Sequence, residues 1–174
     1  MPGVIRALGV LLLLLTAGCA AEPTPPVAAP QTALLPPPPS TSAAPIQCVP
    51  YARQVSGVDL RGDAWTWWSQ AENRYGRGRK PRPGAVLVFA KTRRLPLGHV
   101  SVVTRLVNAR EILVTHANWA SSSDDRGKVT KDVRIIDVSP GNNWSELRVW
   151  NDDLGDFGLV YPAVGFIYPG AAAA

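Results

Sequence analysis

Residues 20–45 are dominated by proline, alanine, threonine and serine, and they include the run Pro36–Pro39. Glu22 is the only charged residue of this segment. Such a composition cannot bury enough apolar surface to offset the entropy lost on folding, and its prolines favour an extended polyproline II conformation. The expected organisation is a disordered tether over residues 19–45, one small domain over residues 46–170 and a short tail over residues 171–174.

The residues before the tether have the features of an export signal. Arg6 precedes an apolar run at residues 8–15, and small residues follow that run. The run is too short to cross a bilayer stably as a helix, so a permanent membrane span is the weaker interpretation. Residues 1–18 are therefore predicted to be a signal peptide.

Thr16-Ala17-Gly18-Cys19 closes this segment and resembles a bacterial lipobox. The resemblance implies that Cys19 becomes the first mature residue and carries the lipid chains that anchor the protein to a membrane. Because Ala20 rather than aspartate follows Cys19, the same resemblance implies an outer-membrane protein of the cell envelope that faces the periplasm. Secretion without a lipid, and an uncleaved anchor, are the alternatives.

The chain contains two cysteines. If Cys19 is acylated, Cys48 is left unpaired in an oxidising compartment, where a free thiol is open to oxidation and cross-linking. The presence of such a thiol indicates a chemical role for Cys48. A buried, inert cysteine is the alternative.

The formal net charge is +5 and the isoelectric point is near 9.6. A basic balance suits nucleic acid, but the export signal argues against that partner. The nearer partners of a basic stretch are anionic envelope polymers or membrane surfaces, and the simpler interpretation is a solvated face that keeps the domain soluble. The basic stretch comprises Arg74, Arg77, Arg79, Lys80, Arg82, Lys91, Arg93 and Arg94.

Two helices are expected at the start of the domain. Cys48 opens the first, and Asp63 is a good N-cap for a second that runs to about Arg74, with Trp65 and Trp68 on its buried face. Later runs rich in β-branched and aromatic residues predict strands at residues 85–90, 99–107, 112–116, 133–138, 147–150 and 164–168. Helices followed by strands predict an α+β fold, in which N-terminal helices pack on a twisted antiparallel sheet of about six strands.

The domain offers few candidates for catalysis, since it contains one cysteine and two histidines. At the start of a helix, backbone N–H groups and the helix dipole favour the thiolate of Cys48, which is a competent nucleophile for a carbonyl. His99 begins a predicted strand and is the candidate general base. His116 and Asn118 lie two residues apart on the next strand, so either is expected to reach the far nitrogen of His99.

Several motifs resemble those of the CHAP family, the cysteine- and histidine-dependent amidohydrolases and peptidases, a branch of the papain-like cysteine hydrolases. The resemblance spans nearly the whole domain in the right order, and it implies a papain-like fold. In chain order the motifs are Gln47-Cys48 with Tyr51, Gly62-Asp63-Ala64 with Trp67, Pro81-Arg82-Pro83-Gly84-Ala85-Val86 with Val88-Phe89, Gly98-His99-Val100 with Val102-Val103, and Gly165-Phe166-Ile167 with Pro169.

The resemblance implies Cys48 as the nucleophile, His99 as the base and Asn118 as the residue that orients the imidazole. His116 stands where many members carry a glutamate, and its role is left open. The backbone N–H of Cys48 is expected to form part of the oxyanion hole, with Gln47 as a candidate second donor.

The implied function is hydrolysis of peptidoglycan amide bonds through a cysteine acyl-enzyme, as an N-acetylmuramoyl-L-alanine amidase or a stem-peptide endopeptidase. The expected enzyme is a monomer without metal or cofactor, and Trp119 is expected to line its cleft. Two other classes stay open. One is a degenerate hydrolase that only binds peptidoglycan in the envelope. The other is a zinc site made by Cys48, His99 and His116, which are residue types that ligate zinc.

Overall fold

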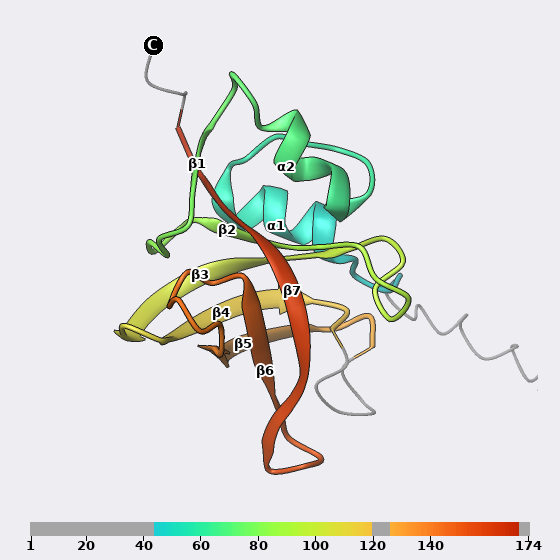
Figure 1. Cartoon of the computed structure of the whole chain (residues 1–174). Coiled ribbons are helices and arrows are strands. Elements are labelled where there is room, and N and C mark those ends of the chain that lie inside the picture. The colour runs from blue at the N-terminus through green and yellow to red at the C-terminus, as the bar shows by residue number, and fades with distance from the viewer. Residues whose placement is uncertain (1–43, 120–125, 171–174) are drawn as a thin grey trace, which may run out of the picture. The chain divides into compact units, whose positions relative to one another are not determined.

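The computed structural model describes residues 44–119 and 126–170 (Figure 1). Contacts divide the chain into two units, residues 1–40 and 41–174, and every described residue belongs to the second unit. The expected signal peptide, Cys19, nearly all of the tether and the C-terminal tail lie outside the described residues. Within the described ranges, no helix is long and apolar enough to cross a membrane.

Antiparallel strands make up most of the described structure. They are β1 (Gly76–Gly78), β2 (Val86–Phe89), β3 (His99–Asn108), β4 (Glu111–Ala117), β5 (Val129–Asp137), β6 (Glu146–Asn151) and β7 (Asp156–Tyr168). Their order in the sheet is β1-β7-β2-β3-β4-β5-β6, and β6 also pairs with β7. Strands β2 to β7 therefore form a closed six-stranded barrel, to which β1 adds along the end of β7.

The long strand β7 closes the barrel because its two halves pair with different neighbours. Residues 156–162 pair with β6, and residues 163–167 pair with β2. Figure 1 shows β7 running past both partners. Gly165 permits this course, since a Cβ there would lie 2.7 Å from the carbonyl oxygen of Gly78.

The predicted α+β fold, with helices packed on an open sheet, is therefore wrong. The described residues form mainly strands, and the sheet is a closed barrel. Alternating patterns predict individual strands, and all six expected strands are present. They do not predict that β7 continues back to Asp156 and reaches β6, because that pairing depends on contacts between distant parts of the sheet.

The helical segments are short: α1 (Cys48–Ser56), the 3₁₀ turn η1 (Ala64–Thr66) and α2 (Trp67–Gln70). α1 ends where Gly57 adopts a left-handed φ of 75° and donates its N–H to the carbonyl of Arg53. The expected second helix is reduced to η1 and one turn of α2. As a result Trp67 is fully buried and Trp68 half-buried, whereas Trp65 is 43 % exposed, so the expected buried position of Trp65 is wrong.

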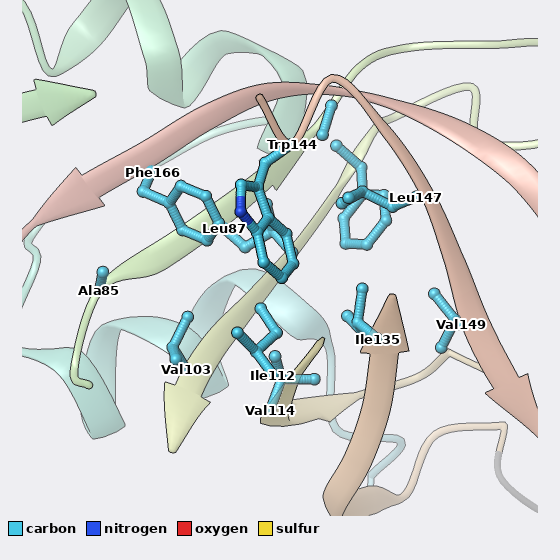
Figure 2. Packing of buried hydrophobic residues seen from close by; sticks show 12 residues of the cluster. Ala85, Leu87, Val103, Ile112, Val114, Ile135, Trp144, Leu147, Val149 and Phe166 are labelled. Atoms are coloured by element: carbon cyan, nitrogen blue, oxygen red, sulfur yellow. The ribbon is translucent and has the colours of Figure 1, made fainter. Parts of the chain in front are cut away.

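Two hydrophobic clusters cover the two faces of β2. Leu87 and Phe89 belong to the cluster inside the barrel, part of which is seen in Figure 2. Val86 and Val88 belong to a second cluster, which Trp67 of the helical layer joins. All four residues of β2 are buried, as expected for a strand covered on both faces. β2 thereby joins the barrel to the layer that carries Cys48.

Candidate active site

Cys48 is the first residue of α1 and is half-buried. Gln47 precedes it in an extended conformation and makes no side-chain cap to the helix. α1 packs on β3 and β4, and Tyr51 ties the helix to β4 through a 2.7 Å hydrogen bond to the Thr115 hydroxyl. The candidate nucleophile is therefore held by a helix that is fixed to the strands carrying both histidines.

His99 is the first residue of β3 and is buried. The preceding residue, Gly98, has a φ of 68°, which favours glycine. Beside it, the backbone N–H of Trp65 donates to the carbonyl of Leu97 at 3.2 Å. A Cβ at Gly98 would lie 2.7 Å from the backbone nitrogen of Trp65. The loop before His99 is thus packed directly, backbone against backbone, on η1.

Gly98→Ala is expected to lower the free energy of unfolding by about 2–4 kcal/mol, because alanine combines a disfavoured φ with a clash against backbone. Gly155→Ala is the matched control. Gly155 also has a positive φ, of 60°, but an added Cβ would have no atom within 4 Å, so a loss of about 1 kcal/mol is expected there. Urea unfolding followed by tryptophan fluorescence measures both losses. If Gly98→Ala and Gly155→Ala lowered the free energy of unfolding equally, an added methyl group at residue 98 would not strain the contact with Trp65.

Cys48 and His99 line one cavity of about 200 Å³, together with Gln47 and Asn118. We call this space the Cys48 cavity. The thiol also lies beside the backbone N–H of Val100, the residue after His99. In the described part of the chain, no hydrogen bond joins the thiol to the His99 ring, whose Nε2 atom is engaged elsewhere. The two groups therefore face a common space rather than forming a closed ion pair.

His116, rather than Asn118, contacts the His99 ring. The Nε2 atom of His99 lies 3.1 Å from the Nδ1 atom of His116, and the Trp119 ring packs against both imidazoles. The outer nitrogen of His116, Nε2, is buried without a hydrogen-bond partner among the described residues. One of the facing nitrogens donates and the other accepts. This contact engages the Nε2 atom of His99 and not its Nδ1 atom.

Asn118 occupies a different position from the one expected. Its Nδ2 atom donates to Oε1 of Gln47 at 2.8 Å, and its Oδ1 atom accepts the N–H of Gly127 at 2.9 Å. A φ of 59° at Asn118 ends the alternation of β4, so the spacing of two residues from His116 does not bring it to His99. Among the described contacts, Asn118 fixes the residue before the nucleophile to the turn before β5 and does not orient His99.

Burial determines the protonation states of the site. It raises the pKa of the Cys48 thiol, although nearby backbone N–H groups act in the opposite direction. Burial, aided by the neighbouring His116, lowers the pKa of His99 well below its usual value. Burial also lowers the pKa of His116 to about 3. The thiol and both rings are therefore neutral in the free protein at neutral pH, and the thiolate expected from the helix start is outweighed by desolvation.

The zinc alternative gains no support from the arrangement. Among the described residues, no group of three or more histidine, cysteine, aspartate and glutamate side chains is placed to hold a metal ion. Cys48, His99 and His116 therefore do not form the kind of cluster that a structural zinc site requires.

The basic stretch is used largely for contacts within the domain. Arg77 pairs with Glu72 at 3.0 Å, and Arg82 lies over an aromatic ring. Arg93 and Arg94, by contrast, are exposed, and Arg94 lines the Cys48 cavity together with His99. The stretch as a whole is therefore not a uniform solvated face.

A second cavity, of about 320 Å³, adjoins the Cys48 cavity, and Trp119 lines it. We call it the aromatic cavity. Its other walls include Arg126, Trp150 and Tyr161, which sequence patterns do not single out. These residues come from the β4–β5 connection, β6 and β7, so no local signal marks them as neighbours. Only the closure of the barrel brings them together.

Comparison with protein families supports the identification made from the motifs. The family model described as the CHAP domain matches residues 39–118, a range that contains Cys48, His99 and His116. A comparison with curated proteins finds no match. The motif around Gly165 lies beyond the matched range. The resemblance to the CHAP family, whose members are generally hydrolytic amidases or peptidases, is thereby confirmed for residues 39–118 of this chain.

Proposed function

We propose that the protein hydrolyses amide bonds of peptidoglycan through a cysteine acyl-enzyme. The observation that carries the proposal is that Cys48 and His99 line one cavity within the segment that matches the CHAP domain. The scissile bond is either the amide between the lactyl group of the sugar and the stem peptide, or an amide within the peptide.

In the proposed reaction, the sulfur of Cys48 attacks the carbonyl carbon while Nδ1 of His99 takes the thiol proton. The charge that develops on the carbonyl oxygen is met by the backbone N–H of Cys48 and by the side-chain NH₂ of Gln47, whose oxygen is held by Asn118. His99 then gives the proton to the leaving amine, and the C–N bond breaks to leave a thioester. Water, deprotonated by His99, attacks the thioester, which releases the acid and restores the thiol.

His116 has a positioning role in this scheme. When His99 is protonated, its Nε2–H donates to Nδ1 of His116, so the proton of neutral His116 lies on its outer nitrogen. A neutral ring stabilises an imidazolium less than a carboxylate does. Charge separation between Cys48 and His99 is therefore expected only when the substrate fills the cavity.

His116→Glu is expected to raise the rate of Cys48 alkylation by iodoacetamide roughly tenfold at about pH 7, because a carboxylate beside His99 favours the imidazolium and hence the thiolate. The mass of the peptide containing Cys48, followed over time at several pH values, measures the rate. His116→Gln is the uncharged control and is expected to stay within about twofold of the wild type. An unchanged rate in His116→Glu would show that residue 116 does not control the thiol–imidazole pair.

Digestion of purified sacculi tests the proposed function. Released fragments are identified by mass spectrometry: a new amino terminus at the first stem residue indicates an amidase, and one further along indicates an endopeptidase. Protein alkylated at Cys48 beforehand is the inactive control. If the intact protein sediments with sacculi and releases no fragments, the protein binds peptidoglycan without cleaving it, and this alternative is correct. Among the described residues, His99 contacts the neutral ring of His116 and no carboxylate, and this observation favours the alternative.

We also infer that Cys19 anchors the protein by lipid to the outer membrane, on the periplasmic side, with residues 20–45 as the tether. The lipobox resemblance and the proline-rich composition support this inference. Labelling cells with a fatty-acid analogue is expected to mark the wild-type protein, and Cys19→Ala is expected to remove the label. Persistence of the label in that variant would contradict lipidation at Cys19.

A further inference from the structure

Two arginines stand on the wall between the Cys48 cavity and the aromatic cavity. Because the two cavities have part of their lining in common, they lie side by side. The aromatic cavity is completed by residues of β6 and β7, the pair of strands that Figure 1 shows extending away from the helices. The shared lining residues are Arg94, Leu95, Asn118 and Arg126.

Neither guanidinium is neutralised by the described part of the domain. Among the residues that the structure describes, no aspartate or glutamate lines either cavity, and no ion pair or hydrogen bond engages Arg94 or Arg126. Other arginines are occupied: Arg53, for example, pairs with Asp59 at 3.1 Å. With respect to the described residues, the two arginines therefore keep their planar sets of N–H donors for a ligand.

The backbone beneath both arginines is held in place. The glycine after Arg126 donates its N–H to the side chain of Asn118 at 2.9 Å. Arg94 lies in a turn that is closed by two 3.0 Å hydrogen bonds between Thr92 and Leu95. Side chains presented from fixed turns lose less freedom when a ligand binds.

Cys48 also borders a third cavity with different chemistry. This cavity, of about 190 Å³, is lined largely by apolar residues, and among the described residues Asp63 is the only charged one in its lining. The Asp63 carboxylate already accepts the indole N–H of Trp65 at 3.2 Å. The surroundings of the nucleophile are thus strongly basic only toward Arg94 and Arg126, which gives an asymmetric ligand a preferred direction.

We propose that Arg94 and Arg126 form a subsite that binds a carboxylate of the peptide substrate next to the scissile amide. Two guanidinium groups suit a planar carboxylate, and the aromatic residues beyond them contact the rest of the ligand. The ligand class is an acidic peptide, and its carboxamide form binds more weakly. The biological meaning of this subsite rests on the proposed hydrolase function, but its recognition of charge can be measured without catalysis.

Alkylation of Cys48 tests the subsite directly. Iodoacetate carries a carboxylate and iodoacetamide is its neutral counterpart; with either reagent the sulfur forms a bond to carbon, iodide leaves and the thiol proton passes to the solvent. The ratio of the two rate constants is read from the mass of the peptide containing Cys48. In Arg94→Gln/Arg126→Gln the iodoacetate-to-iodoacetamide ratio is expected to fall about fivefold, and in the corresponding double lysine variant to be largely restored.

Arg105→Gln/Lys131→Gln is the matched control. Both residues are basic and exposed, and neither lines one of the cavities described above. The alkylation ratio is expected to stay within about 1.5-fold of the wild-type value, since neither side chain lines the cavity in which the thiol reacts and exposed charges are screened by salt. Urea unfolding of both double variants confirms that each is folded before the rates are compared.

A second arm uses stem peptides with free and with amidated carboxylates. The wild type is expected to prefer the free acid about tenfold in kcat/KM, mainly through KM, and Arg94→Gln/Arg126→Gln to lose that preference. If the wild type cleaves neither peptide nor sacculus, the proposed hydrolase function fails, and the alkylation ratio still decides the subsite. An alkylation ratio that is the same in the wild type and the glutamine variant overturns the subsite, whatever is cleaved.

Discussion

Cys48→Ala is expected to lower the release of fragments from sacculi by at least about 10⁴-fold, because the sulfur forms the covalent bond in the proposed reaction and a methyl group cannot. The residue is half-buried at the start of α1, and its replacement removes a single sulfur atom. The free energy of unfolding is therefore expected to change by no more than about 1 kcal/mol. Loss of activity with retained stability assigns the effect to chemistry rather than to folding.

Gln54→Ala, on the exposed face of the same helix, is the matched control for Cys48→Ala. It changes α1 by a similar amount but touches neither the thiol nor the cavity, so full activity is expected. Both variants are compared with the wild type by quantifying soluble muropeptides after digestion. Release that continues at the wild-type rate in Cys48→Ala would refute the assignment of the nucleophile.

Acidification from about pH 7 to about pH 4 is expected to destabilise the protein by about 3 kcal/mol through His116 alone. Burial lowers the pKa of His116 to about 3, whereas the unfolded chain returns it to about 6.5. The unfolded state thus binds a proton that the folded state does not bind. This contribution to stability is complete above about pH 6.5 and is lost as the pH falls toward 3. His99, whose pKa is also lowered, acts in the same direction.

His116→Gln removes the titrating group while keeping a polar side chain of similar size. As the pH falls from about 6 to about 4, the unfolding free energy of the variant is expected to decline less steeply than that of the wild type. The two slopes are expected to differ by about 1 kcal/mol for each pH unit. The comparison of slopes cancels the titration of carboxylates that both proteins share. Urea unfolding at a series of pH values supplies the slopes. If the unfolding free energies of the two proteins changed in parallel with pH, the pKa of His116 would be the same in the folded and unfolded states.

Local patterns in the sequence account for much of the site. Cys48 begins a helix and His99 begins a strand, as predicted, and the strands expected at residues 99–107 and 112–116 are β3 and β4. Each of these features depends on residues only a few positions apart: a helix start, a turn former or an alternation of apolar side chains. Such signals are readable without knowledge of the distant chain.

Local spacing did not predict which side chain contacts the His99 ring. His116 and Asn118 are two residues apart, and strict alternation would place both on one face of a strand. A register shift in β4 beside His116 and a left-handed φ at Asn118 break that alternation. His116 then meets the imidazole, while Asn118 turns to Gln47. Both deviations arise from how β4 pairs with β5 and how the turn at Gly127 packs, which a spacing rule does not contain.

The sequence by itself indicated the resemblance to the CHAP family, the candidate nucleophile and base, and the positions of most strands, because motifs and apolar alternation are local properties of the chain. Only the tertiary structure decided that β7 closes a barrel, that His116 rather than Asn118 meets His99, and that Arg94 and Arg126 share one wall. It also decided that the thiol and both imidazoles are neutral at rest. The physical reason is that strand pairing and desolvation depend on groups far apart in the sequence, and these meet only when the barrel closes.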